Sequence, residues 1–293
     1  MTSAISFALA LATLPISISA QQPRRFDVIS IRENRTAGAH PYSNFPLNPG
    51  PQYNNEGGLL VARDIPILQL LVFAYAHNMY QIQAMRQSLP FWARETGYDV
   101  QARAEGRPTK DEMREMVRSL LADRFGLKLH LETREEPVFQ LVAVHPGKLG
   151  PDLQPAHPNE PPCAAYGPYA NAPVPTIEGG LPAYCGAVLL LPNTTGGQIH
   201  LAGRQVPLSQ LALAIGAFGE MFQRPVVDGT GLPGKYDVSL TFTPESSDPA
   251  HTGQTADVPL SEALRKQLGL KLESGKAPVE VPVLDRLEKP TGN

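Results

Sequence analysis

The stretch 227–236, VDGTGLPGKY, contains the residue types of a phosphate-binding loop. Its first and third glycines and Lys235 match the pattern GxxxxGK[ST] up to the last position, and its three glycines also spell GxGxxG. A phosphate loop works because a helix begins behind it and because a hydroxyl residue after the lysine holds a magnesium ion. Here Tyr236 takes that position, and the sequence YDVSLTF alternates like a strand. We therefore expect these glycines to form a tight turn. We expect the protein to bind neither a nucleotide nor another cofactor.

Two aspartates could also do chemistry, since Asp99 and Asp237 recur beside tyrosines and could form a carboxylate pair for hydrolysis. Each, however, occupies the same place in one of two similar segments, which favours the same local task in both, such as bonding turn amides. The same reasoning applies to Arg63 and Arg204. The seven histidines are scattered, and the sequence contains neither HExxH nor GxSxG. We therefore assign no catalytic, cofactor-binding or metal-binding residues.

The first 20 residues indicate where the protein works. They read MTSAISFALALATLPISISA, contain no charged side chain and include an apolar run from Ile5 to Leu14. This pattern is typical of a secretory signal peptide, and the small residues after the run predict cleavage near Ala20. A short membrane anchor is the alternative, but about 20 apolar residues are needed to cross a bilayer. We therefore expect an exported protein, periplasmic or extracellular, without a transmembrane segment in its mature chain.

The two cysteines, Cys163 and Cys185, offer either a disulfide or part of a metal site. An exported chain meets oxidants, which favours the disulfide. Their spacing, with His157 nearby but followed by a proline, fits no zinc-binding pattern. We therefore predict that Cys163 and Cys185 are bonded to one another.

The composition limits the fold and the partners. Of 293 residues, 42% are hydrophobic and 18% are charged, and the net charge is −3, so nothing indicates a nucleic-acid-binding surface. Thirty prolines and 25 glycines argue for long loops and against an all-helical protein.

The chain contains two similar halves. Three segments of the first half recur in the same order in the second half: 57–71 in 196–215, 97–105 in 235–243, and 120–138 in 263–279. Gly126 and Gly269, for example, both begin the sequence GLKL. Chance explains the shared order poorly, so we predict an internal duplication.

Each half is predicted to run strand, helix, strand, helix and hairpin, an α+β arrangement with small mixed or antiparallel sheets covered by helices. Thr109 and Glu112 form a capping box at the start of the second helix of the first half, and Gly126 ends that helix. The hairpins are expected at 127–144 and 270–287, where a proline falls at the matching turn exit of each.

These elements divide the chain into four parts: a signal peptide at 1–20, a first α+β unit at 21–145, a middle segment at 146–198, and a second unit at 199–293. The middle segment is rich in proline and contains both cysteines. We expect it to be an irregular loop or linker that the disulfide tethers.

Several segments carry a resemblance to a known family; they are FDVISIREN, LLADRFGLKLHLETREEPVFQLV, GGQIHLAGRQVPLSQLA, RPVVDGTGLPGKYDVSLTF and LGLKLESGKAPVEVPVLDRLEKPTGN. Together they span 26–293, and they resemble the soil-associated family of exported bacterial proteins, whose domain has no known function. The resemblance implies no catalytic residues. Because a similar domain is joined to a membrane-bound sensor peptidase in some relatives, it implies a sensing role.

A second resemblance is to the short N-terminal domain of secretins and TonB-dependent receptors. The helix starts VPLSQLALAI and VPLSEALRKQLGLKL carry this likeness. Those domains dock other proteins in the periplasm, so the resemblance implies protein docking.

We therefore expect a non-enzymatic binding or sensing module of the cell envelope, with a cell-envelope protein as its partner. Exposed sheet edges could dock that partner through strand addition. The alternative is an extracytoplasmic hydrolase of peptide or glycan, with a deep polar site between the two units that holds a carboxylate or histidine of perturbed pKa. A purely structural or solute-holding protein is a third hypothesis.

Overall fold

The structure is a computed structural model. It describes residues 23–36, 38, 40–50, 53, 57–157, 161–164, 174–192, 197–217, 224–244 and 258–290. The expected signal peptide at 1–20, with its cleavage site near Ala20, lies outside the described residues.

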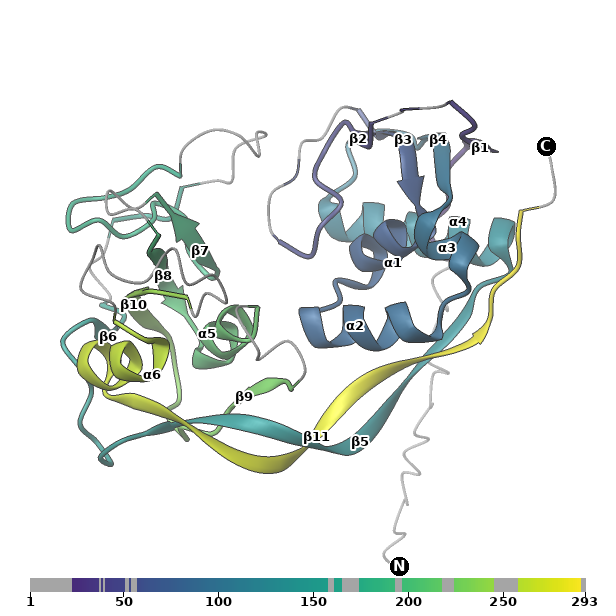
Figure 1. Ribbon diagram of the computed structural model, residues 1–293. Helices are drawn as coiled ribbons and strands as arrows, with labels where there is room; N and C mark the ends of the chain where they lie inside the picture. Colours follow the sequence, from purple (N-terminus) through teal and green to yellow (C-terminus); the bar gives the residue numbers. More distant parts are fainter. Residues whose placement is uncertain are drawn as a thin grey trace, which may run out of the picture.

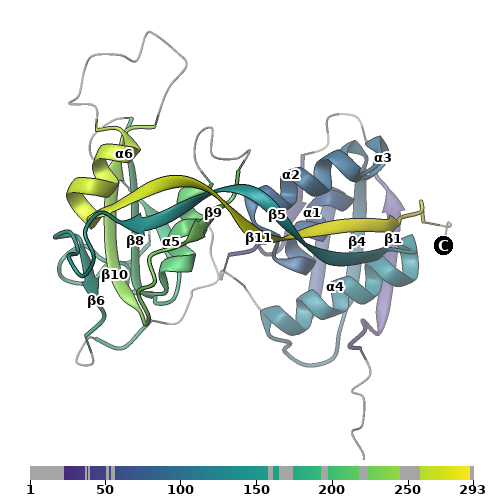
Figure 2. The same ribbon diagram turned by 90° about the horizontal axis from the view of Figure 1, so that it is seen from below.

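Two α+β lobes are joined by a long ribbon of two strands, which runs beneath both lobes in Figure 1 and crosses in front of them in Figure 2. The first lobe comprises the described residues between 23 and 127, and the second lobe comprises those between 144 and 269. Each lobe combines one antiparallel sheet with its own helices and its own apolar core. The predicted α+β class is therefore confirmed.

The sheet of the first lobe has the strand order β1-β4-β3-β2, and helices cover one of its faces (Figure 2). Its elements are β1 (Val28–Glu33), β2 (Tyr42–Ser43), β3 (Leu59–Pro66), α1 (Ile67–Tyr75), α2 (Met79–Ser88), α3 (Phe91–Glu95), β4 (Gly97–Arg103) and α4 (Lys110–Phe125).

Helix α4 begins and ends where the sequence predicts. The Thr109 side chain accepts the N–H of Glu112, and the Glu112 carboxylate accepts the N–H of Thr109 at 2.8 Å, which is the predicted capping box. Gly126 ends the helix in the left-handed region, at φ 58°. The apolar face of the helix is fully inside the core and consists of Met113, Met116, Val117, Leu120 and Leu121.

The sheet of the second lobe has the corresponding order β6-β10-β8-β7. Its elements are β6 (Leu153–Pro155), β7 (Val188–Leu191), β8 (Ile199–Val206), α5 (Leu208–Ile215), β10 (Tyr236–Phe242), α6 (Leu260–Ala263) and the π-helical turn η3 (Leu264–Leu268). Both edge strands, β6 and β7, come from the proline-rich middle segment at 146–198. That segment therefore contributes to the sheet as well as to loops.

The predicted hairpins are wrong. Residues 128–143 form one continuous strand, β5 (Lys128–Ala143), and residues 270–286 form another, β11 (Leu270–Arg286). The two strands pair antiparallel with one another along their whole length, from Leu270 opposite Ala143 to Arg286 opposite Lys128. Residues 226–228 pair with β5 only at Phe139–Leu141, so the outer edge of each strand is open at its prolines, and there a missing N–H breaks no ladder bond. The prolines within these strands therefore mark no turn.

The ribbon connects the two lobes through their cores. Leu141 near the end of β5 belongs to the apolar core of the second lobe, where β9 (Val226–Asp228) pairs parallel with β5. Leu284 near the end of β11 packs against the core of the first lobe, and the N–H of Glu288 donates to the carbonyl oxygen of Phe125 at 2.8 Å. Each lobe thus packs against a strand end that comes from the other half of the chain.

Candidate functional site

The two aspartates that the sequence singled out support matching bulges in the two sheets. Asp99 on β4 accepts the N–H of Asp64 at 3.1 Å, and Asp237 on β10 accepts the N–H of Gln205 at 2.8 Å. Asp64 and Gln205 have left-handed backbones, with φ of 53° and 52°, and both lie where the strand register shifts. The two aspartates therefore do the same local job, as expected, but the amides that they bond lie in strand bulges and not in turns.

The two matching arginines do not share one task, contrary to the prediction. Arg63 is exposed, and its guanidinium lies 5.7 Å from the centre of the Tyr42 ring. Arg204 is completely buried in the second lobe, beside the disulfide that joins Cys163 and Cys185. The difference arises because the middle segment covers β8, whereas only the short strand β2 lies beside Arg63.

The disulfide is present as predicted, with Cα atoms 5.5 Å apart. The glycine-rich stretch that follows β9 forms a turn, as predicted. Asp228 at the end of β9 accepts the N–H of Thr230 at 3.0 Å, and Gly231 and Gly234 have φ of 66° and 94°. The turn leads directly into the strand β10.

A small groove, with a volume of about 20 Å³, lies where the two lobes approach one another. The first lobe lines it with the start of α2, and the second lobe lines it with the end of α5 and the start of β9. The lining residues are Asn78, Met79, Tyr80, Leu213, Gly216, Arg224, Pro225 and Val226. Among the described residues of this lining, Arg224 is the one charged residue, and it shares the groove with apolar residues and with the polar residues Asn78 and Tyr80.

Two polar side chains of the groove, Arg224 and Tyr80, are donors suited to an anion. The guanidinium of Arg224 lies 5.6 Å from the centre of the Phe139 ring, so a cation–π contact with β5 holds it. The Tyr80 hydroxyl is protonated and able to donate at neutral pH; burial, and secondly the carboxylate of Glu136, raise its pKa further, while Arg134 opposes the shift. Neither a carboxylate nor a histidine is among the described residues that line the groove. This chemistry suits a ligand that brings its own carboxylates.

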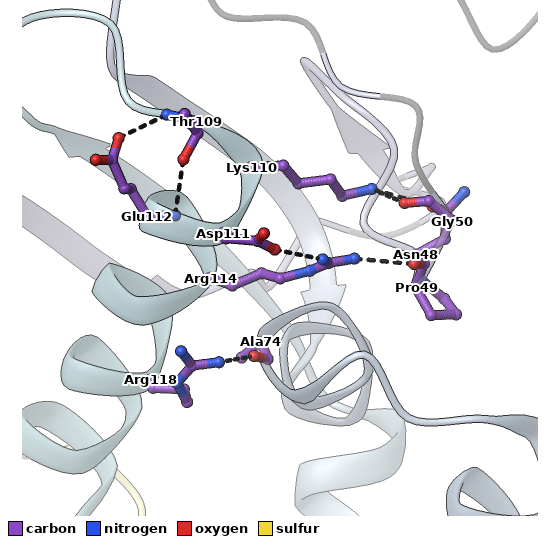
Figure 3. Close-up of polar contacts among 10 residues, drawn as sticks. All are labelled: Asn48, Pro49, Gly50, Ala74, Thr109, Lys110, Asp111, Glu112, Arg114 and Arg118. Atoms are coloured by element: carbon purple, nitrogen blue, oxygen red, sulfur yellow. Dashed lines mark hydrogen bonds and ion pairs between the residues drawn. The ribbon is translucent and has the colours of Figure 1, made fainter. Parts of the chain in front are cut away.

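A row of three cations on α4 is a second candidate (Figure 3). Lys110, Arg114 and Arg118 follow one another at intervals of four residues and so lie on one face of the helix. Each donates to a backbone carbonyl oxygen of another segment: Gly50, Pro49 at 2.9 Å and Ala74 at 2.6 Å, respectively. Lys110 and Arg114 also lie over the ring of Phe73, and Arg118 lies over that of Tyr75.

The row connects structural elements of the first lobe. Its donors reach the loop before β3 and the end of α1, so it ties these segments to α4 (Figure 3). Burial, followed by the nearby charge of Arg114, lowers the pKa of Lys110 to about 8. Because these cations already bond protein carbonyls, the groove is the better candidate for a ligand.

A scan against protein-family models finds a match over residues 68–287 to DUF3738, a family described as proteins of unknown function. The chain belongs to the DUF3738 family. The matched residues run from α1 to the end of the ribbon and include every residue that lines the groove. No curated protein and no solved structure matches this DUF3738 protein.

Sequence reasoning missed the groove residues Tyr80 and Arg224. Neither belongs to a recognisable motif, and they are separated by 224 − 80 = 144 positions, so only the folded chain brings them to one groove. Within the part of the DUF3738 protein that the structure describes, no group of three or more histidine, cysteine, aspartate or glutamate side chains could hold a metal ion. Among the same residues, no helix has the length and apolar character needed to span a membrane.

Proposed function

We propose that this DUF3738 protein is an exported, non-enzymatic binding module of the cell envelope, and that its ligand docks in the groove between the lobes. The observation that carries the proposal is the position of Arg224, an exposed cation in a groove that both lobes line with apolar and polar residues. Binding sites of this kind combine apolar contact area with a few polar groups that fix orientation. We infer that the ligand is a protein segment with acidic side chains.

Export is part of this proposal. The uncharged leader at 1–20 and the disulfide between Cys163 and Cys185 both support an oxidising compartment outside the cytoplasm. The resemblance of the helix starts to periplasmic docking domains supports the envelope as the place of binding.

We also propose that the two lobes arose by duplication of one unit. The support comes from the matching strand orders, from the bulges at Asp64 and Gln205, and from the prolines that precede the first helices. Pro66 and Pro207 have nearly the same backbone conformation, with φ of −69° in both and ψ of 153° and 148°. In a duplicated protein the groove is a new surface, because neither unit alone provides its two walls.

The test is site-specific photo-crosslinking in envelope extract. A benzophenone side chain replaces Leu213, which lines the groove and is 41% exposed. The matched control replaces Leu190, which is 59% exposed on β7 and does not line the groove. We expect one reproducible protein adduct from position 213 and none from position 190.

Charge variants of the groove sharpen this test. Arg224→Glu reverses the charge and should abolish the adduct at position 213, whereas Arg224→Lys keeps the charge and should retain much of it. Equal adducts from positions 213 and 190, or an adduct that survives Arg224→Glu, would refute docking in the groove. A partner that is recovered cleaved, in step with the amount of this protein, would favour the hydrolase instead.

A further inference from the structure

The disulfide between Cys163 and Cys185 lies against a buried cation. Arg204 on β8 is completely buried, and its Nε and Nη2 atoms lie 3.3 Å and 3.1 Å from the Sγ atom of Cys185. The same Nη2 donates to the carbonyl oxygen of Pro161 at 2.8 Å. The guanidinium is therefore held in place between the two chain segments that the disulfide joins.

The two sulfur atoms have different surroundings. Cys163 is an exposed residue, and its Sγ atom lies 3.8 Å from the side-chain oxygen of Gln205. Cys185 is half-buried, and its Sγ atom is the one that faces the guanidinium of Arg204. A nucleophile that comes from solvent therefore reaches Cys163 first, and a negative charge is stabilised on Cys185.

We propose that this disulfide is a thiol-exchange site, in which a small-molecule thiolate attacks Cys163 and Cys185 leaves as a thiolate held by Arg204. In this step a sulfur–sulfur bond forms between the incoming sulfur and Cys163, while the bond between Cys163 and Cys185 breaks. The negative charge of the incoming thiolate passes to Cys185. The products are a mixed disulfide on Cys163 and a Cys185 thiolate, so atoms and electrons balance without a further reactant.

The direction of attack follows from the stability of the leaving group. Exchange is faster when the leaving sulfur is the more stable thiolate, and a neighbouring arginine stabilises a thiolate. A guanidinium at 3.1 Å in a buried environment does this more strongly than one in water, because the low local dielectric strengthens the charge-assisted contact. Attack on Cys185 would instead leave the charge on the exposed Cys163 and would require a path past the buried side.

The exchange has a structural consequence for the second lobe. The segment before Cys185 packs Val174, Leu181 and Tyr184 against a small apolar cluster of β7 and β8 that contains Leu189 and Leu191. The N–H of Ala164 donates to the carbonyl oxygen of Ala183 at 2.9 Å, so the two sides of the disulfide are also joined by their backbones. Opening the disulfide removes the covalent tie of this layer and lets it loosen from the sheet. A thiol in the surroundings would thus change which apolar surface the second lobe exposes.

The first experiment uses the unmodified full chain. It is incubated with glutathione near neutral pH, free thiols are blocked at successive times, and peptides are mapped by mass spectrometry. We expect glutathione on Cys163 and the blocking group on Cys185 in the first product. Glutathione on Cys185, an equal mixture of the two, or no reaction over hours would overturn the proposal.

Variants of Arg204 test the role of the cation. Arg204→Lys keeps a positive charge near Cys185 and should react at close to the rate of the unmodified protein. Arg204→Met removes the charge and should slow the exchange about three- to tenfold, because a leaving thiol of higher pKa leaves more slowly. Equal rates for all three proteins would overturn the role of Arg204.

A direct measurement remains decisive where Arg204→Met folds poorly. The variant Cys163→Ser leaves Cys185 as a free thiol beside an intact Arg204, and its thiolate absorbs near 240 nm. We expect this absorbance at neutral pH in Cys163→Ser, and not in the matched Cys185→Ser, whose remaining cysteine is exposed. Equal thiolate signals in the two variants would overturn the assignment of Cys185 as the leaving group.

Discussion

The bulge in the first sheet gives the sharpest prediction about stability. The carboxylate of Asp99 accepts the N–H of Asp64 at 3.1 Å and the side-chain N–H of Asn34 at 2.9 Å. Asp64 lies in the left-handed region at φ 53°, a conformation that non-glycine residues adopt only when their surroundings hold them there. In Asp99→Ala both donors lose their acceptor, and the bulge loses the group that fixes it.

The expected loss of stability is moderate. A hydrogen bond to a charged group contributes roughly 1.5–3 kcal/mol, so two such bonds set an upper limit near 6 kcal/mol. The side chain of Asp99 is 26% exposed, so water replaces part of what is lost. We therefore expect the free energy of unfolding to fall by about 2 kcal/mol. Asp99→Asn keeps an acceptor oxygen at the same position and should lose about half as much.

The assay uses the single tryptophan. Trp92 packs against the core of the first lobe, so its fluorescence during urea unfolding reports on that lobe. A loss of about 2 kcal/mol lowers the urea midpoint by about 1 M. Asp237→Ala, which removes the equivalent acceptor in the second lobe, is the matched control and should shift the circular-dichroism transition more than the fluorescence transition. A fluorescence midpoint that Asp99→Ala leaves unchanged would refute the reasoning about the bulge.

Three further predictions concern other parts of the chain. Gly57→Ala and Gly58→Ala form a matched pair, since both glycines have positive φ. The Cβ at position 57 meets only open space, so this variant should lose about 1 kcal/mol of stability. The Cβ at position 58 would lie 2.2 Å from the backbone oxygen of Ala104, so thermal unfolding should show a clearly larger loss. The folded-state pKa of Lys110 is lowered to about 8, so the unfolded chain binds more protons than the folded chain between pH 8 and about 10. The free energy of unfolding, measured by urea titration, should therefore rise with pH over this window. Lys110→Met should remove that rise. N-terminal sequencing of the exported protein should begin just after Ala20, and a protein that retains residue 1 would contradict the predicted leader.

Local sequence signals predicted local structure well in this chain. Thr109 and Glu112 predicted the start of α4, and Gly126 predicted its end, because capping needs only residues within one turn of one another. The recurrence of Asp99 and Asp237 predicted the same local task for both, and the structure shows each on the N–H of a left-handed residue, in a strand bulge and not in the expected turn. The pairing of the two cysteines also followed from the sequence, since the chain has no other cysteine to choose from.

Contacts between distant residues were beyond the sequence. The prolines in β5 and β11 suggested two hairpins, because proline is a turn signal that reflects only its neighbouring residues. In the structure β5 pairs with β11 instead, which joins residues more than 120 positions apart, such as Leu270 and Ala143 (270 − 143 = 127). The groove around Arg224 likewise exists only because the ribbon brings the two lobes together.

By itself, then, the sequence determined the α+β class, the ends of helix α4, the glycine turn before β10 and the disulfide. These depend on backbone geometry and on short-range hydrogen bonds, which the neighbouring residue types settle. The tertiary structure alone decided that two strands form one ribbon, that Arg204 is buried while Arg63 is exposed, and that Tyr80 and Arg224 line one groove. These features depend on which distant surfaces bury one another, and the same local pattern is compatible with several such arrangements.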